Sequence, residues 1–159
     1  NPETVCAPTP QPLMKLQQNT RLALYSLLEF ASNPQRKIAA AEIADKYNVS
    51  SHHLAKVLAE LSRMGMVQSV RGVGGGYRFT GNARRLTLMD IISLFEDSLP
   101  NEDAAPTGTP IEQALTSVLS EVDAIARASM SSITLATMLR IVARQQEGAC
   151  AASSDRLLD

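Results

Sequence analysis

The sequence predicts a mainly α-helical fold with one short β-hairpin, and three observations support this prediction. Hydrophobic residues make up 45 % of the 159 residues but aromatic residues only 4 %, which favours an aliphatic core between helices. The apolar residues recur mostly at the three- and four-residue spacing of amphipathic helices. Four of the eight glycines fall within residues 70–79, between two short β-like runs, as is typical of a hairpin.

The first helices follow a tail. Residues 1–13 hold four of the eight prolines and show no periodicity, so a flexible N-terminal tail is expected there. A first domain is expected over residues 14–97, with helices at 20–32 and 39–47. A third helix is predicted over 51–64, because its apolar residues form one stripe: Leu54, Val57, Leu58, Leu61 and Met64. The serines at 48–51 are expected to cap this helix, and Gly65 to end it.

The second half of the chain continues with helices. Short strands are predicted at 66–70 and 77–80, and Thr87 with Asp90 predicts a capping box at the start of a helix over 87–97. Residues 98–110 have the composition of a loop. Two helices are expected over 111–146, interrupted near 131–134, followed by a flexible tail at 147–159. The first of them has an apolar stripe, which is either core or a dimer seam: Ile111, Leu115, Val118, Leu119, Val122, Ile125 and Ala126.

This order of elements indicates a winged helix–turn–helix. Two short helices, a tight turn, a helix with a polar outer face and a glycine-tipped hairpin make up that fold, in which the third helix lies in the major groove of DNA. The residues nearest the bases would then be Ser51, His52, Ala55 and Lys56. His53 lies at the edge of the apolar stripe, where core packing and a phosphate contact are both open.

The hairpin sequence VRGVGGGYRF is interpreted as the wing. Glycines there let the backbone approach a sugar–phosphate wall, and arginines supply charge. The candidate DNA contacts are Arg71, Gly72, Gly74, Gly75, Tyr77 and Arg78. A purely structural hairpin is the alternative. A dinucleotide loop is excluded because no helix pattern follows the glycines, and a Walker loop because the Gly-Lys-Ser/Thr ending is absent.

Charge is divided between the halves of the chain. Residues 14–86 carry eleven Lys/Arg and four Asp/Glu, a net charge of +7, whereas residues 87–159 carry four and eleven, a net charge of −7. A basic half joined to an acidic half points to a polyanionic partner for the first half.

With these motifs in hand, the chain resembles the Rrf-two type family of bacterial regulators that includes IscR, NsrR and CymR. The resemblance rests on SSHHLAKVLAELSRMGMVQSVRGVGGGYRF, on MKL at 14–16 and on ITLATML at 133–139, and covers about residues 14–145. It is closest to the NsrR branch, whose HxxK pattern His53 and Lys56 match. The resemblance implies a homodimer, joined by a long helix over 111–130, that binds pseudo-palindromic promoter DNA, mostly as a repressor.

The chain departs from the iron–sulfur members of that family. Such members carry three cysteines before the dimerisation helix, but loop 98–110 has none. Arg21 stands where NsrR-like proteins supply an acidic ligand, and Ala55 where IscR carries a glutamate. The expected protein therefore resembles CymR in having no cluster, and no cofactor is predicted. A small-molecule or protein effector is left open.

Other classes are weighed against this interpretation. No catalytic set of residues is apparent, so an enzyme is not expected. The adjacent His52 and His53 point about 100° apart on a helix and do not make a metal site. Cys6 and Cys150 are candidates for a thiol switch, the basis of one alternative, a redox-sensing repressor. The other alternative is a winged-helix protein-interaction module.

No apolar run reaches the roughly 20 residues of a membrane span, and a cytoplasmic protein is expected.

Overall fold

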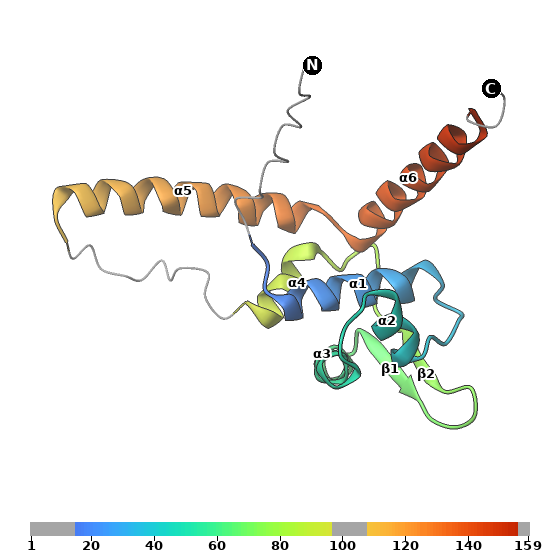
Figure 1. Cartoon of the computed structure of the whole chain (residues 1–159). Coiled ribbons are helices and arrows are strands. Elements are labelled where there is room, and N and C mark those ends of the chain that lie inside the picture. Colours follow the sequence, from blue (N-terminus) through green and yellow to red (C-terminus); the bar gives the residue numbers. More distant parts are fainter. Residues whose placement is uncertain (1–14, 97–107, 156–159) are drawn as a thin grey trace, which may run out of the picture.

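The computed structural model describes residues 15–96 and 108–155. Three helices come first, followed by a two-stranded antiparallel sheet and three further helices (Figure 1). Their bounds are Gln18–Ser32 (α1), Ala40–Lys46 (α2), Ser51–Arg63 (α3), Val67–Val70 (β1), Gly76–Phe79 (β2), Leu88–Phe95 (α4), Pro110–Ser132 (α5) and Leu135–Asp155 (α6). The predicted mainly α-helical fold with one hairpin is confirmed.

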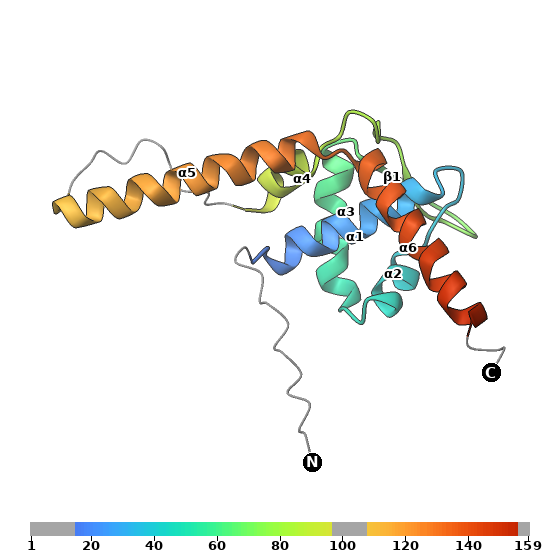
Figure 2. The same ribbon diagram turned by 90° about the horizontal axis from the view of Figure 1, so that it is seen from above.

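The core surrounds α1, which packs against α3, α4, α6 and β2. Figure 2 shows α1 crossing α3 at the centre of the molecule, with α4 and α6 on the other side of α1 in Figure 1. The largest fully buried side chains come from five helices: Leu27 and Phe30, Ile43, Leu54, Leu58 and Leu61, Ile91, and Leu135. Burial of these aliphatic groups is the main stabilising contribution to the fold.

The two ends of α3 differ from each other. At its C-terminus, the N–H groups of Gly65 and Met66 donate to the carbonyls of Ser62 and Leu61, both at 3.0 Å, the pattern of a Schellman motif. Gly65 therefore ends the helix as predicted. At its N-terminus, Ser50 occupies the cap position but its side chain makes no capping hydrogen bond. The predicted serine cap is wrong, and the first N–H groups of α3 stay available.

A side chain at the end of α4 is hydrogen-bonded to the start of α1. The Glu96 carboxylate, at the end of α4, accepts hydrogen bonds from the Gln17 N–H at 2.8 Å and from the Thr20 hydroxyl at 2.6 Å. The other end of α4 has the predicted capping box: the Asp90 N–H donates to the Thr87 hydroxyl, and the Thr87 N–H donates to the Asp90 carboxylate at 2.8 Å.

The junction of α5 and α6 is hydrogen-bonded to the segment at 83–88, which leads from β2 into α4. The chain is extended at Ile133, and Leu88 N–H donates to the Ile133 carbonyl at 2.9 Å. Leu135 N–H donates in turn to the Leu86 carbonyl at 2.9 Å, while the Leu135 side chain is fully buried. The interruption predicted near 131–134 is confirmed. The chain between the two helices is hydrogen-bonded to residues 83–88.

Helix α5 forms an arm that extends away from the α1–α4 body (Figure 1). It begins with a capping box between Thr109 and Glu112 and with Pro110 at its first position. Hydrogen bonds from the Thr109 N–H and hydroxyl lower the pKa of the Glu112 carboxyl. None of the residues of α5 is buried in the single chain.

One predicted boundary, the end of the last helix, differs from the structure. The flexible tail expected at 147–159 is wrong for most of its length, because α6 continues to Asp155. The segment GACAA at 148–152 is rich in alanine, the strongest helix former. The expected tail at 1–13 and most of the predicted loop at 98–110 lie outside the described residues. In the part of the chain that is described, no helix has the length and apolarity that a bilayer crossing requires.

Candidate nucleic-acid interface

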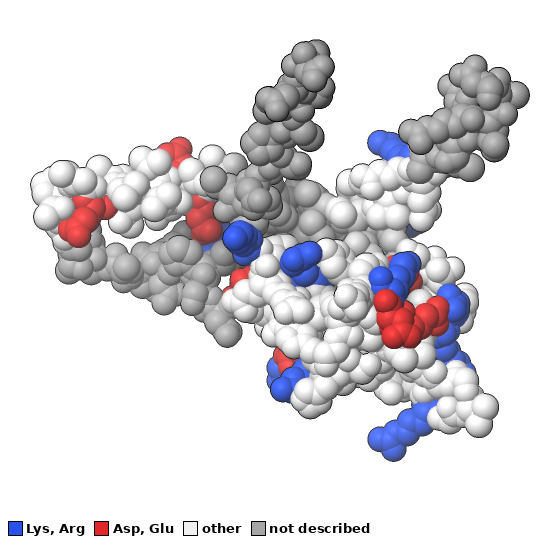
Figure 3. All heavy atoms as spheres, in the orientation of Figure 1, with Lys and Arg blue, Asp and Glu red and all other residues white. Residues whose placement is uncertain are grey.

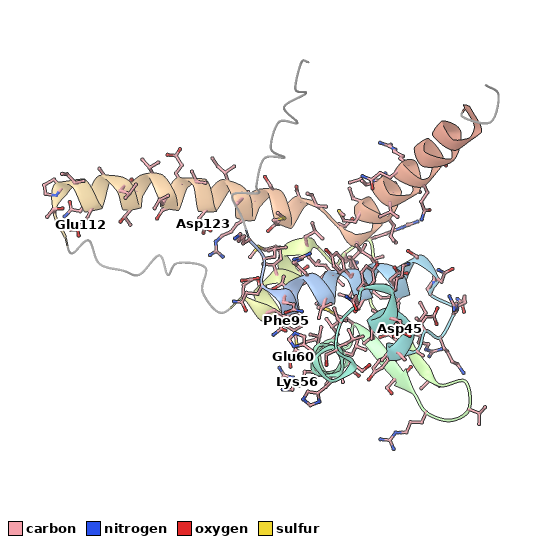
Figure 4. All side chains as sticks on the ribbon, in the orientation of Figure 1. Asp45, Lys56, Glu60, Phe95, Glu112 and Asp123 are labelled. Carbon is pink, nitrogen blue, oxygen red and sulfur yellow. The ribbon has the colours of Figure 1, made fainter. Side chains whose placement is uncertain are left out.

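The outer face of α3 carries the side chains predicted to contact bases. Ser51, His52, Ala55 and Lys56 are all exposed on this face, opposite the stripe that anchors α3 in the core. Figure 4 shows Lys56 on the side of α3 that faces away from α1. Because Ala55 is small, the helix backbone at this point presents little obstacle to a closely approaching groove, while the other three offer hydrogen-bonding groups.

His53 differs from its neighbours on α3. The residue is half-buried, and its Nε2 atom is shielded from solvent with no hydrogen-bond partner among the described residues. Of the two roles left open for His53, its placement favours packing at the edge of the core over a phosphate contact.

Another basic side chain, Arg63, lies on the same outer face, about two helical turns beyond Lys56. Arg63 is exposed, and Glu60 of the same helix holds its guanidinium in an ion pair. Glu60 also raises the pKa of Arg63, so the arginine stays charged. The pair places one negative charge beside the basic face, which sequence reasoning did not consider.

The wing tip is a tight turn between β1 and β2. Gly75 N–H donates to the Gly72 carbonyl at 2.9 Å, and Gly72 and Gly74 adopt positive φ angles of 107° and 70°, which favour glycine. Arg71 and Val73 are exposed at this tip, and Val73 is fully so. The tip therefore presents one cation, Arg71, and one fully exposed apolar side chain, Val73. Of the two, only Arg71 had been predicted as a DNA contact.

The other two glycines serve the protein's own packing. A Cβ atom on Gly75 would lie 2.5 Å from the Val70 carbonyl oxygen, and one on Gly76 would lie 2.6 Å from the Ile38 carbonyl oxygen. Both positions thus require glycine for internal close approach. This internal role of Gly75 was not predicted, and its contact with a DNA backbone stays a prediction.

Tyr77 is also turned inward. Its backbone N–H and carbonyl pair with Ile38 at 2.8 and 2.9 Å, and its ring lies 6.2 Å from that of Phe30. The half-buried ring packs against the core, a role that the sequence did not indicate, and its contact with DNA stays a prediction. Tyr77 instead joins the wing to the segment before α2.

Arg78 has a partner across the hairpin. Strand pairing places it opposite Gln68, and the guanidinium donates to the Gln68 side-chain oxygen at 3.0 Å. Both residues are exposed. Gln68 was not predicted, although the two-residue alternation of the strands would have placed it on the same face as Arg78.

Charge is distributed over the surface as the sequence predicted for the two halves. In Figure 3, Lys and Arg side chains project from the lower margin of the molecule, below α3 and at the wing. The α5 arm on the other side displays Asp and Glu, among them Glu112 and Asp123 (Figure 4). The basic groups of α3 and the wing therefore project on one side of the molecule, away from the acidic arm.

The described residues do not fit a metal or cluster site. Among them, no three His, Cys, Asp or Glu side chains gather closely enough to hold an ion. The sequence has only two cysteines, Cys6 and Cys150. Cys6 lies outside the described residues, and Cys150 lies in α6 with its side chain undescribed, so the predicted thiol switch stays a prediction.

Comparison with known proteins places this geometry among regulators. The model of the Rrf2 family, described as iron-dependent transcriptional regulators, matches residues 16–141. A relative from Rhodopseudomonas palustris, named HTH-type transcriptional regulator BadM, is 47 % identical over 130 residues, which cover 81 % of this chain and 83 % of that protein.

Solved structures share the fold. CymR of B. subtilis, described as its global cysteine regulator, aligns with a TM-score of 0.68 at 23 % identity, covering 81 % of this chain and 98 % of CymR. IscR of T. potens aligns with a TM-score of 0.65 at 25 % identity, covering 81 % and 88 % of the two chains.

Proposed function

Because the chain belongs to the Rrf2 family of transcriptional regulators, we propose that it is a homodimeric, sequence-specific DNA-binding repressor. The observation that carries this proposal is the exposed basic face shared by α3 and the wing, with Lys56 on the helix and Arg71 and Arg78 on the hairpin. Cations on one face attract the negatively charged phosphate backbone of a duplex.

Helix α3 lies in the major groove in this proposal. Its exposed face offers Ser51 and His52 to base edges near the helix start, and Lys56 to a base or a phosphate. The N-terminal N–H groups of α3, which the Ser50 side chain does not cap, suit a phosphate oxygen. The wing then reaches the adjacent backbone or minor groove with Arg71, while Gln68 holds Arg78 in place for a phosphate.

The dimer forms through α5 in this proposal. The apolar stripe of α5 is exposed in the single chain, from Val122 at 49 % to Ile111 at 81 %. Apolar surface of this extent on one face of a long helix favours a partner helix, and a second copy offers the same stripe. A two-fold dimer would present two copies of α3 to the two halves of a palindromic site.

In this proposal, the protein represses transcription because its dimer occupies promoter DNA and so excludes RNA polymerase. We propose further that the dimer works without an iron–sulfur cluster, since the described residues supply no ligand set. An effector, either a small molecule or a protein, then sets its occupancy of DNA.

Two alanine variants test the placement of DNA. Arg71→Ala is expected to weaken binding to DNA from upstream of the protein's own gene by about 1–3 kcal/mol if Arg71 reads a base. Lys56→Ala, if Lys56 contacts phosphate, is expected to weaken binding equally on upstream and scrambled DNA, and to reduce the salt slope by about one. Fluorescence anisotropy measures both.

The matched control is Arg144→Ala, which removes the same charge from exposed α6. It should leave the affinity close to that of the wild type. If Arg71→Ala and Lys56→Ala change the affinity no more than Arg144→Ala does, the face formed by α3 and the wing is not where DNA binds.

A further inference from the structure

A pocket of about 790 Å³ lies where α1, α2 and α6 meet. Its volume falls within the roughly 300–1,000 Å³ that is usual for small-molecule sites. The proposed DNA contacts on α3 and the wing take no part in its lining. The pocket therefore needs an explanation other than DNA binding.

Part of the pocket lining is aliphatic and aromatic. Leu28 on α1 and both Leu139 and Val142 on α6 contribute half-buried aliphatic side chains. Tyr25 and Tyr47 stack on each other beside them, with ring centroids 4.8 Å apart and planes 14° apart. Side chains of this kind suit an apolar, flat ligand body.

The polar part of the lining has a net charge of +1, from Arg36 and Lys46 against Glu29. The Glu29 carboxylate is already satisfied, because the Tyr47 hydroxyl and the Lys46 ammonium both lie 2.5 Å from it. Burial alone would raise the pKa of Glu29, but these two partners outweigh it and lower the pKa. Glu29 therefore stays ionised and neutralises Lys46.

Arg36 supplies the remaining charge. Its partner, Glu42 at 2.6 Å, lies outside the lining, and more than half of the Arg36 side chain is exposed. An exposed ion pair of this kind contributes little stability. A ligand anion can therefore compete for the Arg36 guanidinium, which also offers paired donors to a carboxylate.

We propose that this pocket binds a small organic monoanion with an apolar body, whose charge pairs with Arg36 and whose body packs between the tyrosines and α6. The proposal goes beyond DNA binding and does not depend on it. It gives a chemical class to an effector that the family assignment leaves unnamed.

The position of the pocket provides a route to regulation. One wall is α1, which packs on α3, and the other is α6, which is joined to the α5 arm at Ile133. A ligand between them contacts both the DNA-reading unit and the dimerisation unit. If DNA binding changes the spacing of α1 and α6, ligand and DNA change each other's affinity by the same factor.

Isothermal titration of the full chain, without DNA, tests the proposal with 1-naphthoate as the probe and neutral 1-naphthamide as its matched analogue. Saturable binding of one naphthoate per chain is expected, with the amide weaker by about fivefold, as for one exposed charge pair in water. Arg36→Gln should weaken naphthoate by a similar factor. Lys37→Gln, an adjacent exposed lysine outside the lining, should leave it unchanged.

A second pair of variants locates the site. Val142→Glu places a carboxylate in the pocket and should abolish naphthoate binding, whereas Gln145→Glu, exposed on α6 outside the lining, should not. Circular dichroism checks that both variants fold. No saturable binding, equal affinity for acid and amide, or binding that survives Val142→Glu would each overturn the proposal. None of these results would bear on DNA binding.

Discussion

Replacing Val118 and Leu119 together by glutamate is expected to convert the proposed dimer into a monomer. Both side chains are more than half exposed in the single chain, at 59 % and 57 %, so the fold of each chain should persist. In the dimer the new carboxylates would be buried against the partner's apolar stripe. Burying unpaired charges costs several kcal/mol, so the dimer dissociation constant should rise by roughly a thousandfold or more.

Light scattering coupled to size exclusion measures the change of mass directly. Binding to the upstream DNA should fall with it, toward the non-specific level, because a monomer engages one half-site only. The matched control is Gln113→Glu with Ser120→Glu, which adds the same charge on the opposite, exposed face of α5. A dimer that survives the stripe variant, or that the control dissociates equally, would show that α5 is not the seam.

Gly76→Ala is expected to have the second large effect, on stability and on the wing. The added Cβ would lie 2.6 Å from the oxygen and 2.8 Å from the carbon of the Ile38 carbonyl. These are backbone atoms, so β2 must move away from residue 38. The two hydrogen bonds between Tyr77 and Ile38, now 2.8 and 2.9 Å, would lengthen. We expect a loss of about 2–4 kcal/mol in the free energy of unfolding.

Urea unfolding followed by circular dichroism gives this free energy. The control is Gly148→Ala in α6, where nothing lies within 4 Å of an added Cβ. Alanine there should be neutral or stabilise the helix by up to about 1 kcal/mol. An unchanged unfolding midpoint for Gly76→Ala would mean that the wing is not held to residue 38 as described.

The sequence was sufficient for the elements whose signals are local. Apolar spacing placed α1, α2 and α3 within two residues of their observed bounds. The capping box at Thr87 was read from two residues three positions apart, and it is present. The outer face of α3 followed from helical periodicity, since burial of Leu54, Leu58 and Leu61 leaves Ser51, His52 and Lys56 exposed.

Features that depend on distant residues were missed. The pairing of residues 133–136 with 83–88, the inward turn of Tyr77 and the close approach of Gly76 to Ile38 all join segments far apart in the chain. A glycine that lets the protein's own backbone come close cannot be told, from sequence alone, from a glycine that lets a ligand come close. Gly75 and Gly76 are of the first kind in the structure. The pocket is lined from three separate helices, so no local pattern indicates it.

The most direct test of the central claim is the affinity of the wild-type protein for DNA from upstream of its own gene, measured by fluorescence anisotropy at several salt concentrations against a scrambled duplex. We predict tight binding that prefers the upstream DNA. The logarithm of the binding constant should fall with the logarithm of salt by about 0.9 for each phosphate neutralised. Weak binding, equal on both duplexes and insensitive to salt, would contradict a sequence-specific DNA-binding function and favour a protein-interaction module.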